Sequence, residues 1–208
     1  MDLYEYEREL YNSGIKYIAG VDEVGRGPLN GPVISACVVL PKNFIPEGLT
    51  DSKKLTEKKR DYFYDIINEN ALGIGIGIVD AAEIDRINIY EAAKKSMLIA
   101  INNCNHKIDH VLIDAMKLDL DIPSTSIIKG DAKSISIAAA SVIAKVTRDR
   151  MMYELDKKYP MYGYKNHKGY PTKKHIEAIN EYGLIDGYRK TYGPVKEYLE
   201  KKECSWGK

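Results

Sequence analysis

Four acidic residues stand directly after apolar runs of the chain, at positions typical of strand ends. Asp22 and Glu23 follow the first such run. Asp114 ends a later run, and Asp131 follows the next one and opens a helical segment. In an open α/β sheet, ligands collect at the carboxyl ends of the strands. We therefore expect these four side chains to converge on one site.

Convergent carboxylates repel one another and are costly to desolvate unless a cation lies between them. A set of ligands made only of oxygen atoms favours Mg²⁺ or Mn²⁺ over zinc. Two such ions about 4 Å apart would activate a water molecule and stabilise the leaving oxygen of an in-line phosphoryl displacement. The pattern therefore predicts a metal-dependent phosphodiesterase site.

Simpler interpretations exist for each acid. A single Asp after a strand is more often a turn former or a helix N-cap than a metal ligand, and for Asp131 alone the cap would be favoured. Asp22 and Glu23 are neighbours, and neighbouring strand residues point to opposite faces of a sheet. Both can reach one metal site only if the strand ends or bulges there, which the glycines that follow permit.

A basic and aromatic segment runs from residue 157 to residue 175. It carries six lysines, four tyrosines and the histidines His167 and His175. Basic residues mixed with aromatic ones suit a surface that follows a nucleic-acid backbone, although a solvated helix end and loop would have the same composition. The two histidines are either general acids or surface residues, and their spacing does not decide between these roles.

The overall composition restricts the class of protein. The chain has 208 residues, of which 44% are hydrophobic and 29% charged, with a net charge of +1. Its cysteines, Cys37, Cys104 and Cys204, are far apart, as expected of unpaired thiols in a reducing compartment. The acidic N-terminus has no apolar signal core, and no apolar run approaches the roughly 20 residues of a membrane helix. We therefore expect a cytoplasmic protein without a membrane partner.

Hydrophobic patterning predicts an α/β fold with a mixed sheet and a helical C-terminal extension. Strands are expected at 17–21, 33–40, 73–79, 110–115 and 126–129, and helices at 3–13, 56–70, 81–104, 134–158 and 172–182. The alternating glycines of 73–77 indicate a strand against which another element packs closely. Asn88 is a possible break in the helix expected at 81–104. The charged end of the long helix, from Arg148 onward, should reach solvent. The chain after residue 183 should be less regular.

Several blocks of the sequence closely resemble the ribonuclease HII family, the type 2 ribonucleases H. They lie at 19–33 (with Asp22 to Leu29 at its centre), 51–56, 129–149 and 167–172, and the resemblance covers residues 17 to about 195. It implies an RNase H fold, in which a five-stranded mixed sheet is flanked by helices. Residues 1–14 would then form a short N-terminal helix. Residues 15–208 would form the catalytic domain, including the helical extension from about residue 160.

The resemblance also implies an activity. The four acids match the family's acidic tetrad, which binds two Mg²⁺ or Mn²⁺ ions. The family hydrolyses the RNA strand of RNA–DNA hybrids and cuts 5′ of ribonucleotides embedded in duplex DNA, leaving a 3′-hydroxyl and a 5′-phosphate. Such nucleic acids are the expected partners, and a monomer is the simplest expectation.

The resemblance assigns substrate-binding roles as well. Gly25, Arg26 and Gly27 would read the ribose 2′-hydroxyl through their backbone, and Tyr170 would stack near that sugar. The composition of the segment with Ser52 and Lys53 indicates an exposed loop, and these two residues are our candidates for contact with the phosphates of the substrate. Asn30 and Ala115 depart from residues that are common in the family, and neither departure changes a ligand. The alternatives are another two-metal nuclease of the same fold and a nucleic-acid-binding module whose acids are only helix caps.

Overall fold

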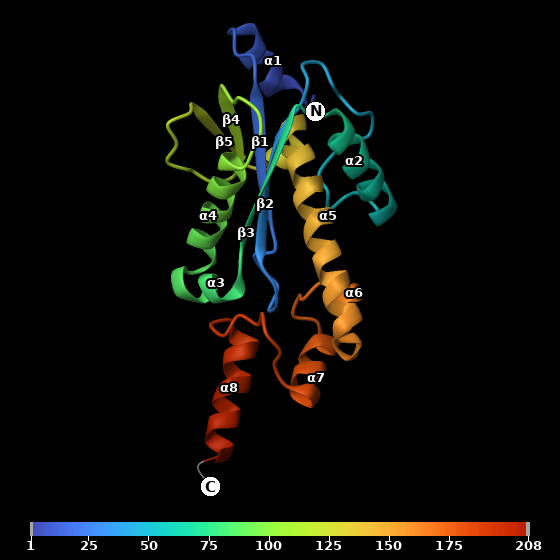
Figure 1. Ribbon diagram of the computed structural model, residues 1–208, viewed down its shortest axis with the longest axis vertical. Coiled ribbons are helices and arrows are strands. Elements are labelled where there is room, and N and C mark those ends of the chain that lie inside the picture. Colours follow the sequence, from blue (N-terminus) through green and yellow to red (C-terminus); the bar gives the residue numbers. More distant parts are fainter. Residues whose placement is uncertain (1, 207–208) are drawn as a thin grey trace.

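The protein is built on one five-stranded mixed sheet (Figure 1). The structure, a computed structural model, describes residues 2–206, with side chains up to residue 203, so the Cys204 thiol lies outside the description. The strands run in the order β3-β2-β1-β4-β5. The antiparallel part pairs β1 with β2 and β2 with β3, and β4 and β5 continue the sheet in parallel from β1. The predicted mixed sheet is confirmed, with the following strand bounds: Ile18–Val24 (β1), Val33–Val39 (β2), Gly73–Val79 (β3), His110–Asp114 (β4) and Ser124–Ile127 (β5).

Helices cover both faces of the sheet. The long helix α5 (Ile135–Lys158) packs on β1 and β2, and α2 (Glu57–Asn70) lies outside α5. On the other face, α4 (Ile89–Asn102) packs on β2 and β3. All seven residues of β2 are buried, which explains why this strand is apolar without alternation.

Glycines allow the helices to approach the sheet closely. A Cβ atom on Gly75 or Gly77 would lie 2.1 Å from the Ala100 carbonyl oxygen or 1.9 Å from the Ser96 carbonyl oxygen of α4. On the opposite face, a Cβ on Gly20 of β1 would lie 2.0 Å from the Ser136 carbonyl carbon of α5. The close packing predicted for 73–77 is confirmed, and Gly20 has the same role against α5.

The long helix begins beside the N-terminal helix α1 (Glu5–Asn12). Ser134 is the N-cap of α5, and its hydroxyl accepts a hydrogen bond from the Ile137 N–H. The buried carboxylate of Glu7 accepts hydrogen bonds from the Ser134 hydroxyl at 2.6 Å and from the Ser136 N–H at 3.0 Å. Helix α1 is thus attached to the first turn of the central helix, where a negative charge is favourable.

The helical segment expected at 81–104 is interrupted at Asn88, which has a φ of 68°. The break separates α3 (Ala81–Ile87) from α4, and the Asn88 side chain caps α4 by accepting from the N–H groups of Tyr90 and Glu91. Asn adopts a positive φ more often than most other residues with a side chain. The possible break is therefore real.

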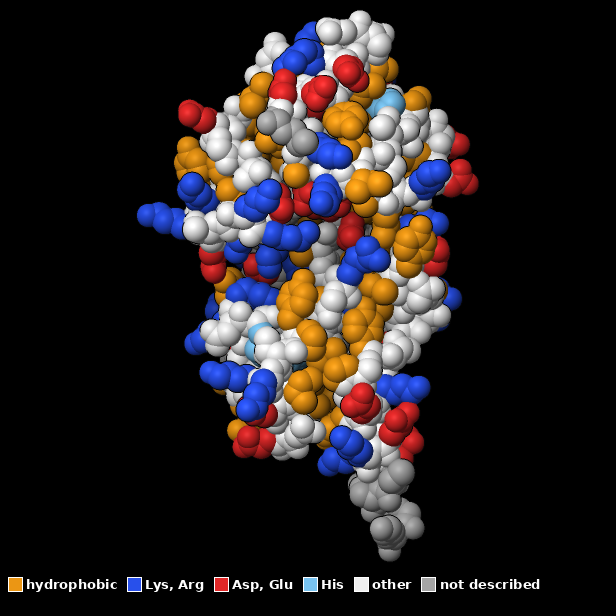
Figure 2. Space-filling view, turned by 180° about the vertical axis from the view of Figure 1, so that it is seen from behind, with side chains coloured by type: hydrophobic (Ala, Val, Ile, Leu, Met, Phe, Trp, Pro, Cys, Tyr) orange, Lys and Arg blue, Asp and Glu red, His pale blue; other side chains and the backbone are white. Residues whose placement is uncertain are grey.

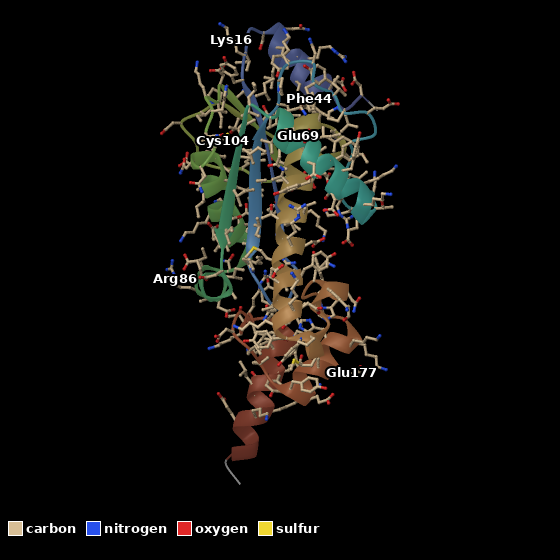
Figure 3. The ribbon with its side chains drawn as sticks, turned by 45° about the vertical axis from the view of Figure 1, so that its right-hand side comes forward. Lys16, Phe44, Glu69, Arg86, Cys104 and Glu177 are labelled. Carbon is tan, nitrogen blue, oxygen red and sulfur yellow. The ribbon has the colours of Figure 1, made fainter. Side chains whose placement is uncertain are left out.

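The C-terminal extension lies beyond one end of the sheet and continues from α5 (Figures 1 and 3). It consists of the turn η2 (Pro160–Tyr162) and the helices α6 (Tyr164–His167), α7 (Lys173–Tyr182) and α8 (Gly193–Trp206). Its apolar residues form a separate core cluster around Tyr162, Tyr164 and Val195. The expectation of a loose stretch after residue 183 is wrong, because α8 occupies most of it. Within residues 2–206, no helix has the length and apolar character that crossing a membrane requires.

Candidate active site

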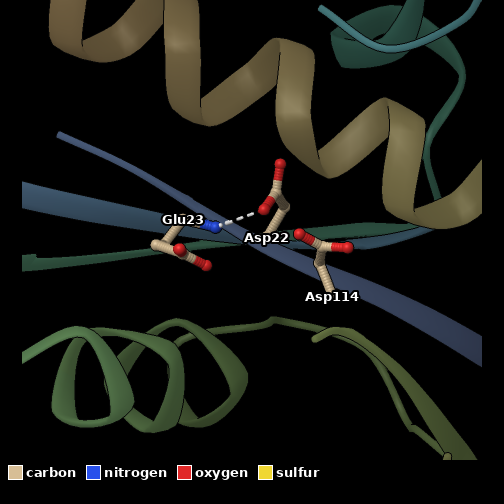
Figure 4. Close-up of side chains that lie close together, drawn as sticks. All are labelled: Asp22, Glu23 and Asp114. Atoms are coloured by element: carbon tan, nitrogen blue, oxygen red, sulfur yellow. Dashed lines mark hydrogen bonds between the residues drawn. The ribbon is translucent and has the colours of Figure 1, made fainter. Parts of the chain in front are cut away.

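Three of the four predicted acids meet where β1 and β4 stop pairing. The parallel register of these strands ends at Val21 and Ile113, while β1 continues to Val24 along β2. Carboxylate oxygens of Asp22, Glu23 and Asp114 all lie within 4.8 Å of one another (Figure 4). The expectation that β1 ends before Asp22 is wrong. The loss of the β4 partner after Val21 opens the space for the acids instead.

Burial and mutual repulsion perturb these carboxyl groups. Burial, with the charges of Glu23 and Asp114 next in importance, raises the pKa of Asp22 well above its usual value. Burial raises the pKa of Glu23 to about 7, against the opposing influence of the Arg26 guanidinium, which lies 3.6 Å away. Both acids therefore favour a cation in their midst.

Available lone pairs in the cluster fit a divalent ion. Oε2 of Glu23 is buried without a hydrogen-bond partner in the described part of the chain. Oδ1 of Asp22 accepts from the Glu23 N–H at 2.8 Å, and Oδ1 of Asp114 accepts from the Gly130 N–H at 2.6 Å. These two hydrogen bonds fix the orientation of the carboxylates. The second oxygen atom of each carboxylate takes no part in them. An all-oxygen set with an orphaned buried atom is suited to Mg²⁺ or Mn²⁺.

Asp131 borders this cluster without belonging to the group of three. It lies in the turn η1 (Gly130–Ala132) and is buried, with Oδ2 3.9 Å from Nζ of Lys53. Burial and then the charges of Asp51 and Asp114 raise its pKa. The N-cap of α5 is Ser134, so the alternative that Asp131 is only a helix cap is wrong. Asp131 is a buried acid close enough to Asp114 to be affected by its charge.

The loop that follows β1 places Gly27 against the ring of Tyr170. A Cβ on Gly27 would lie 3.3 Å from Cε1 of that ring. Tyr170 is 40% exposed, so its ring borders the loop and also faces solvent. Gly25 has a φ of 95°, and a Cβ there would lie 2.4 Å from Nε of Arg148. The structure thus brings the glycine loop and Tyr170 together, about 140 residues apart in sequence.

Ser52 and Lys53 have different surroundings. The Ser52 hydroxyl is buried and shares a 2.8 Å hydrogen bond with the hydroxyl of Ser141 on α5. The Lys53 side chain is 76% exposed and points its ammonium toward Asp131. Arg60 supports this loop by donating to the carbonyl oxygens of Ser52 and Leu55. Lys53 is therefore available to a ligand at the acidic cluster, whereas the Ser52 hydroxyl fixes the loop to α5. Figure 2 shows acidic side chains between Lys and Arg side chains on the middle of one face.

Comparison with known proteins identifies the family to which this chain belongs. The model of the family described as ribonuclease HII matches residues 19–192. The chain belongs to the ribonuclease HII family. A ribonuclease HII of Bacillus cytotoxicus is 57% identical over 202 residues, which cover 97% of this chain and 78% of that protein. A ribonuclease HII of Bacillus cereus is 58% identical over 200 residues, covering 96% and 78%. The chain is thus a ribonuclease H enzyme.

Solved structures share the fold. The ribonuclease H2 from Pyrococcus horikoshii superposes with a TM-score of 0.78 at 27% identity, covering 90% of this chain and 99% of that one. The Bst-RNase HIII structure in complex with Mn²⁺ has a TM-score of 0.66 at 16% identity, covering 91% and 71%. The RNase H-like fold inferred from the sequence is confirmed.

Two buried arginines of this ribonuclease HII chain were not anticipated as part of the site. Arg148 on α5 donates to the carbonyl oxygens of Asn30, Pro32 and Lys168. The charged end of α5 reaches solvent as expected from Arg150 onward, but Arg148 is fully buried and Asp149 is buried as well. Arg189 is also fully buried and donates to the carbonyl oxygens of the glycine loop. No local pattern distinguishes either from a surface arginine.

The two histidines have neither of the roles considered for them. They are buried and stacked, with ring centroids 4.3 Å apart. Nδ1 of His175 contacts the Tyr170 carbonyl oxygen and must donate to it, so Nε2 accepts from the Tyr188 hydroxyl. Nδ1 of His167 accepts from the Gly169 N–H. Burial lowers the pKa of both and brings that of His175 to about 4. These are neutral residues that hold the backbone around Tyr170.

Proposed function

We propose that this protein hydrolyses the RNA strand of RNA–DNA hybrids and also cuts on the 5′ side of single ribonucleotides embedded in duplex DNA. The products would be a 3′-hydroxyl and a 5′-phosphate. The observation that carries the proposal is the buried cluster of Asp22, Glu23 and Asp114, bordered by Asp131 and by the contact between Gly27 and Tyr170. The names of the relatives and the match to their family support the same activity.

Asp22, Glu23, Asp114 and Asp131 would hold two Mg²⁺ or Mn²⁺ ions. When bound, these ions would supply activation of the attacking water and stabilisation of the leaving oxygen. The protein's own contribution is a rigid set of acids: the Gly130 N–H fixes Asp114, and the Glu23 N–H fixes Asp22. Their raised pKa values mean that binding a cation displaces protons from the cluster.

Selection of a ribonucleotide requires contact with the 2′-hydroxyl, the group that distinguishes RNA from DNA at a given position. The glycines at 25 and 27 let the backbone approach a sugar closely, and the Tyr170 ring bounds the same space. A phenol ring in that place would sense the position of the sugar and of the deoxyribose that follows. Lys53 and Arg26, both more than 45% exposed, would neutralise the adjacent phosphates.

The decisive experiment uses a labelled DNA duplex with one ribonucleotide, incubated with and without Mn²⁺ or Mg²⁺. We expect one cut 5′ of the ribonucleotide with the ion and none with EDTA. An identical duplex of DNA alone is the control, and it should stay intact. Failure to cut any ribonucleotide-containing duplex in the presence of the ions would refute the proposal.

The same assay separates the alternatives. Cleavage of a ribonucleotide-free four-way junction would indicate another two-metal nuclease of this fold. Binding of duplexes without cleavage, together with no effect of Mn²⁺ on the melting temperature, would indicate a nucleic-acid-binding module. We further propose a cytoplasmic monomer, which gel filtration and cell fractionation test.

A further inference from the structure

The first part of the loop that follows β1 is held by Arg189 and Tyr192 of the C-terminal extension, whereas Arg148 of α5 holds Asn30 and Pro32. The Arg189 guanidinium donates to the Gly25 carbonyl oxygen at 2.6 Å and to the Arg26 carbonyl oxygen at 2.8 Å. It also donates twice to the Gly31 carbonyl oxygen, at 2.8 and 3.1 Å. The Tyr192 hydroxyl donates to the Arg26 carbonyl oxygen at 2.6 Å and accepts from Arg189 at 3.0 Å.

These contacts determine the direction of two amide groups. The peptide bonds of the loop are trans, so each N–H points away from the carbonyl oxygen of the same peptide unit. With the carbonyls of Gly25 and Arg26 directed at Arg189, the N–H groups of Arg26 and Gly27 point to the opposite side. Within residues 2–206 these two N–H groups have no protein acceptor. They are free donors, and the Tyr170 ring lies beside Gly27.

The burial of Arg189 indicates that this is a dedicated arrangement. Its side chain is fully buried, and among the described residues no carboxylate lies within 4 Å of it. Burial, the largest influence, lowers its pKa. A buried charge without a counter-ion is expensive, and an apolar side chain would fill the space at lower cost. The planar guanidinium supplies a rigid fork of donors that a lysine cannot match.

We propose that Arg189, assisted by Tyr192, is a positioning residue for ribose recognition, because it aims the N–H groups of Arg26 and Gly27 at the 2′-hydroxyl of the substrate. The inference rests on the proposed function. Arg189 does not touch the substrate itself. Its effect is to keep two donors in the orientation that a hydroxyl oxygen requires, so that the free energy of ordering the loop is not lost on binding.

The test measures binding rather than cleavage. Kd is determined by fluorescence anisotropy in the Asp22→Asn background, for two duplexes that differ in one ribonucleotide. We expect that protein to prefer the ribonucleotide duplex by about tenfold, the net worth of one or two hydrogen bonds. Arg189→Lys should reduce the preference to near unity while leaving Kd for the all-DNA duplex unchanged. Tyr192→Phe should reduce it in part. Tyr182→Phe, an exposed tyrosine of α7, is the matched control and should retain it.

The outcomes separate the two proposals. If Arg189→Lys and Tyr192→Phe retain the full preference, or weaken both duplexes equally, Arg189 is structural and the inference is wrong. A parent protein with no preference also overturns it. Should Arg189→Lys fail to fold, Tyr192→Phe decides alone. The proposed function is judged separately, by cleavage of the single-ribonucleotide duplex by the unmodified protein.

Discussion

Removing one charge from the acidic cluster should stabilise the metal-free protein while abolishing its activity. In Asp22→Asn, the amide keeps the oxygen that accepts from the Glu23 N–H and loses the negative charge. At the 4.8 Å that bounds the cluster, two unit charges repel by about 3 kcal/mol at an effective dielectric constant of about 20. Burial, the largest cause of the raised Glu23 pKa, is unchanged by the substitution, so the gain comes only from the removed repulsion.

The pH dependence gives this prediction its sign. A raised pKa means that the folded protein retains a proton that the unfolded chain releases above pH 4.5, so the free energy of unfolding falls as pH rises from 4.5 to about 7. At pH 8, where the acids repel one another, the variant should be more stable by the about 3 kcal/mol of removed repulsion, which for a domain of this size raises Tm by roughly 6–12 °C. Near pH 5, where the raised pKa values of Asp22 and Glu23 keep these two acids protonated, the difference should largely disappear.

Thermal melts of both proteins at the two pH values, in EDTA and in Mn²⁺, measure these effects. With Mn²⁺ the order should reverse at pH 8, because the ion stabilises only the intact cluster. Hydrolysis should be lost and duplex binding largely retained. Asp119→Asn, which removes an exposed carboxylate, is the control and should change neither the melting temperature nor hydrolysis. If Asp22→Asn is no more stable than the unmodified protein in EDTA at pH 8, the acids are not crowded charges and the metal-site reasoning fails.

Three further predictions concern the surroundings of the cluster. Tyr170→Ala should harm cleavage at a single embedded ribonucleotide more than cleavage of an all-RNA strand, and equal losses would contradict its role at the sugar. Because the pKa of His175 is lowered to about 4, stability should fall by about 3 kcal/mol between pH 6.5 and 4. The free energy of unfolding of His175→Gln, measured with urea at both pH values, should not show this decrease. Gly25→Ala should destabilise the protein more than Gly14→Ala, since both have a positive φ but only Gly25 would also collide with Arg148, and Tm measures the difference.

The sequence predicted the elements and acids whose signals are local. The apolar runs before Asp22 and Asp114 gave the strands, and the alternating glycines of β3 gave the close contact with α4. The continuation of β1 to Val24 was missed because it depends on pairing with β2, which persists after the pairing with β4 has ended. Helix α8 was missed because its apolar residues pack on a small separate core, to which Leu29 and Met152 also contribute from distant parts of the chain.

The supporting residues of the site could not be found in this way. Arg189 bonds carbonyl oxygens 163 and 164 positions earlier in the chain, and Arg148 bonds one 118 positions earlier. For an arginine without a local partner in the sequence, a solvated side chain is the ordinary expectation. The histidine pair is similar, since its neutrality follows from burial against Tyr162 and Tyr188 and not from its spacing.

Buried charges of opposite sign are stabilised in different ways on the two sides of the site. The arginines are satisfied within the protein, because backbone carbonyl oxygens of the loop accept their hydrogen bonds. The acids are not, because Oε2 of Glu23 has no partner in the described chain and the pKa values of Asp22 and Glu23 are raised. The arginines that orient the loop therefore have all their partners before substrate binds, whereas the acidic cluster requires cations. Metal binding should consequently raise stability without changing the orientation of the loop.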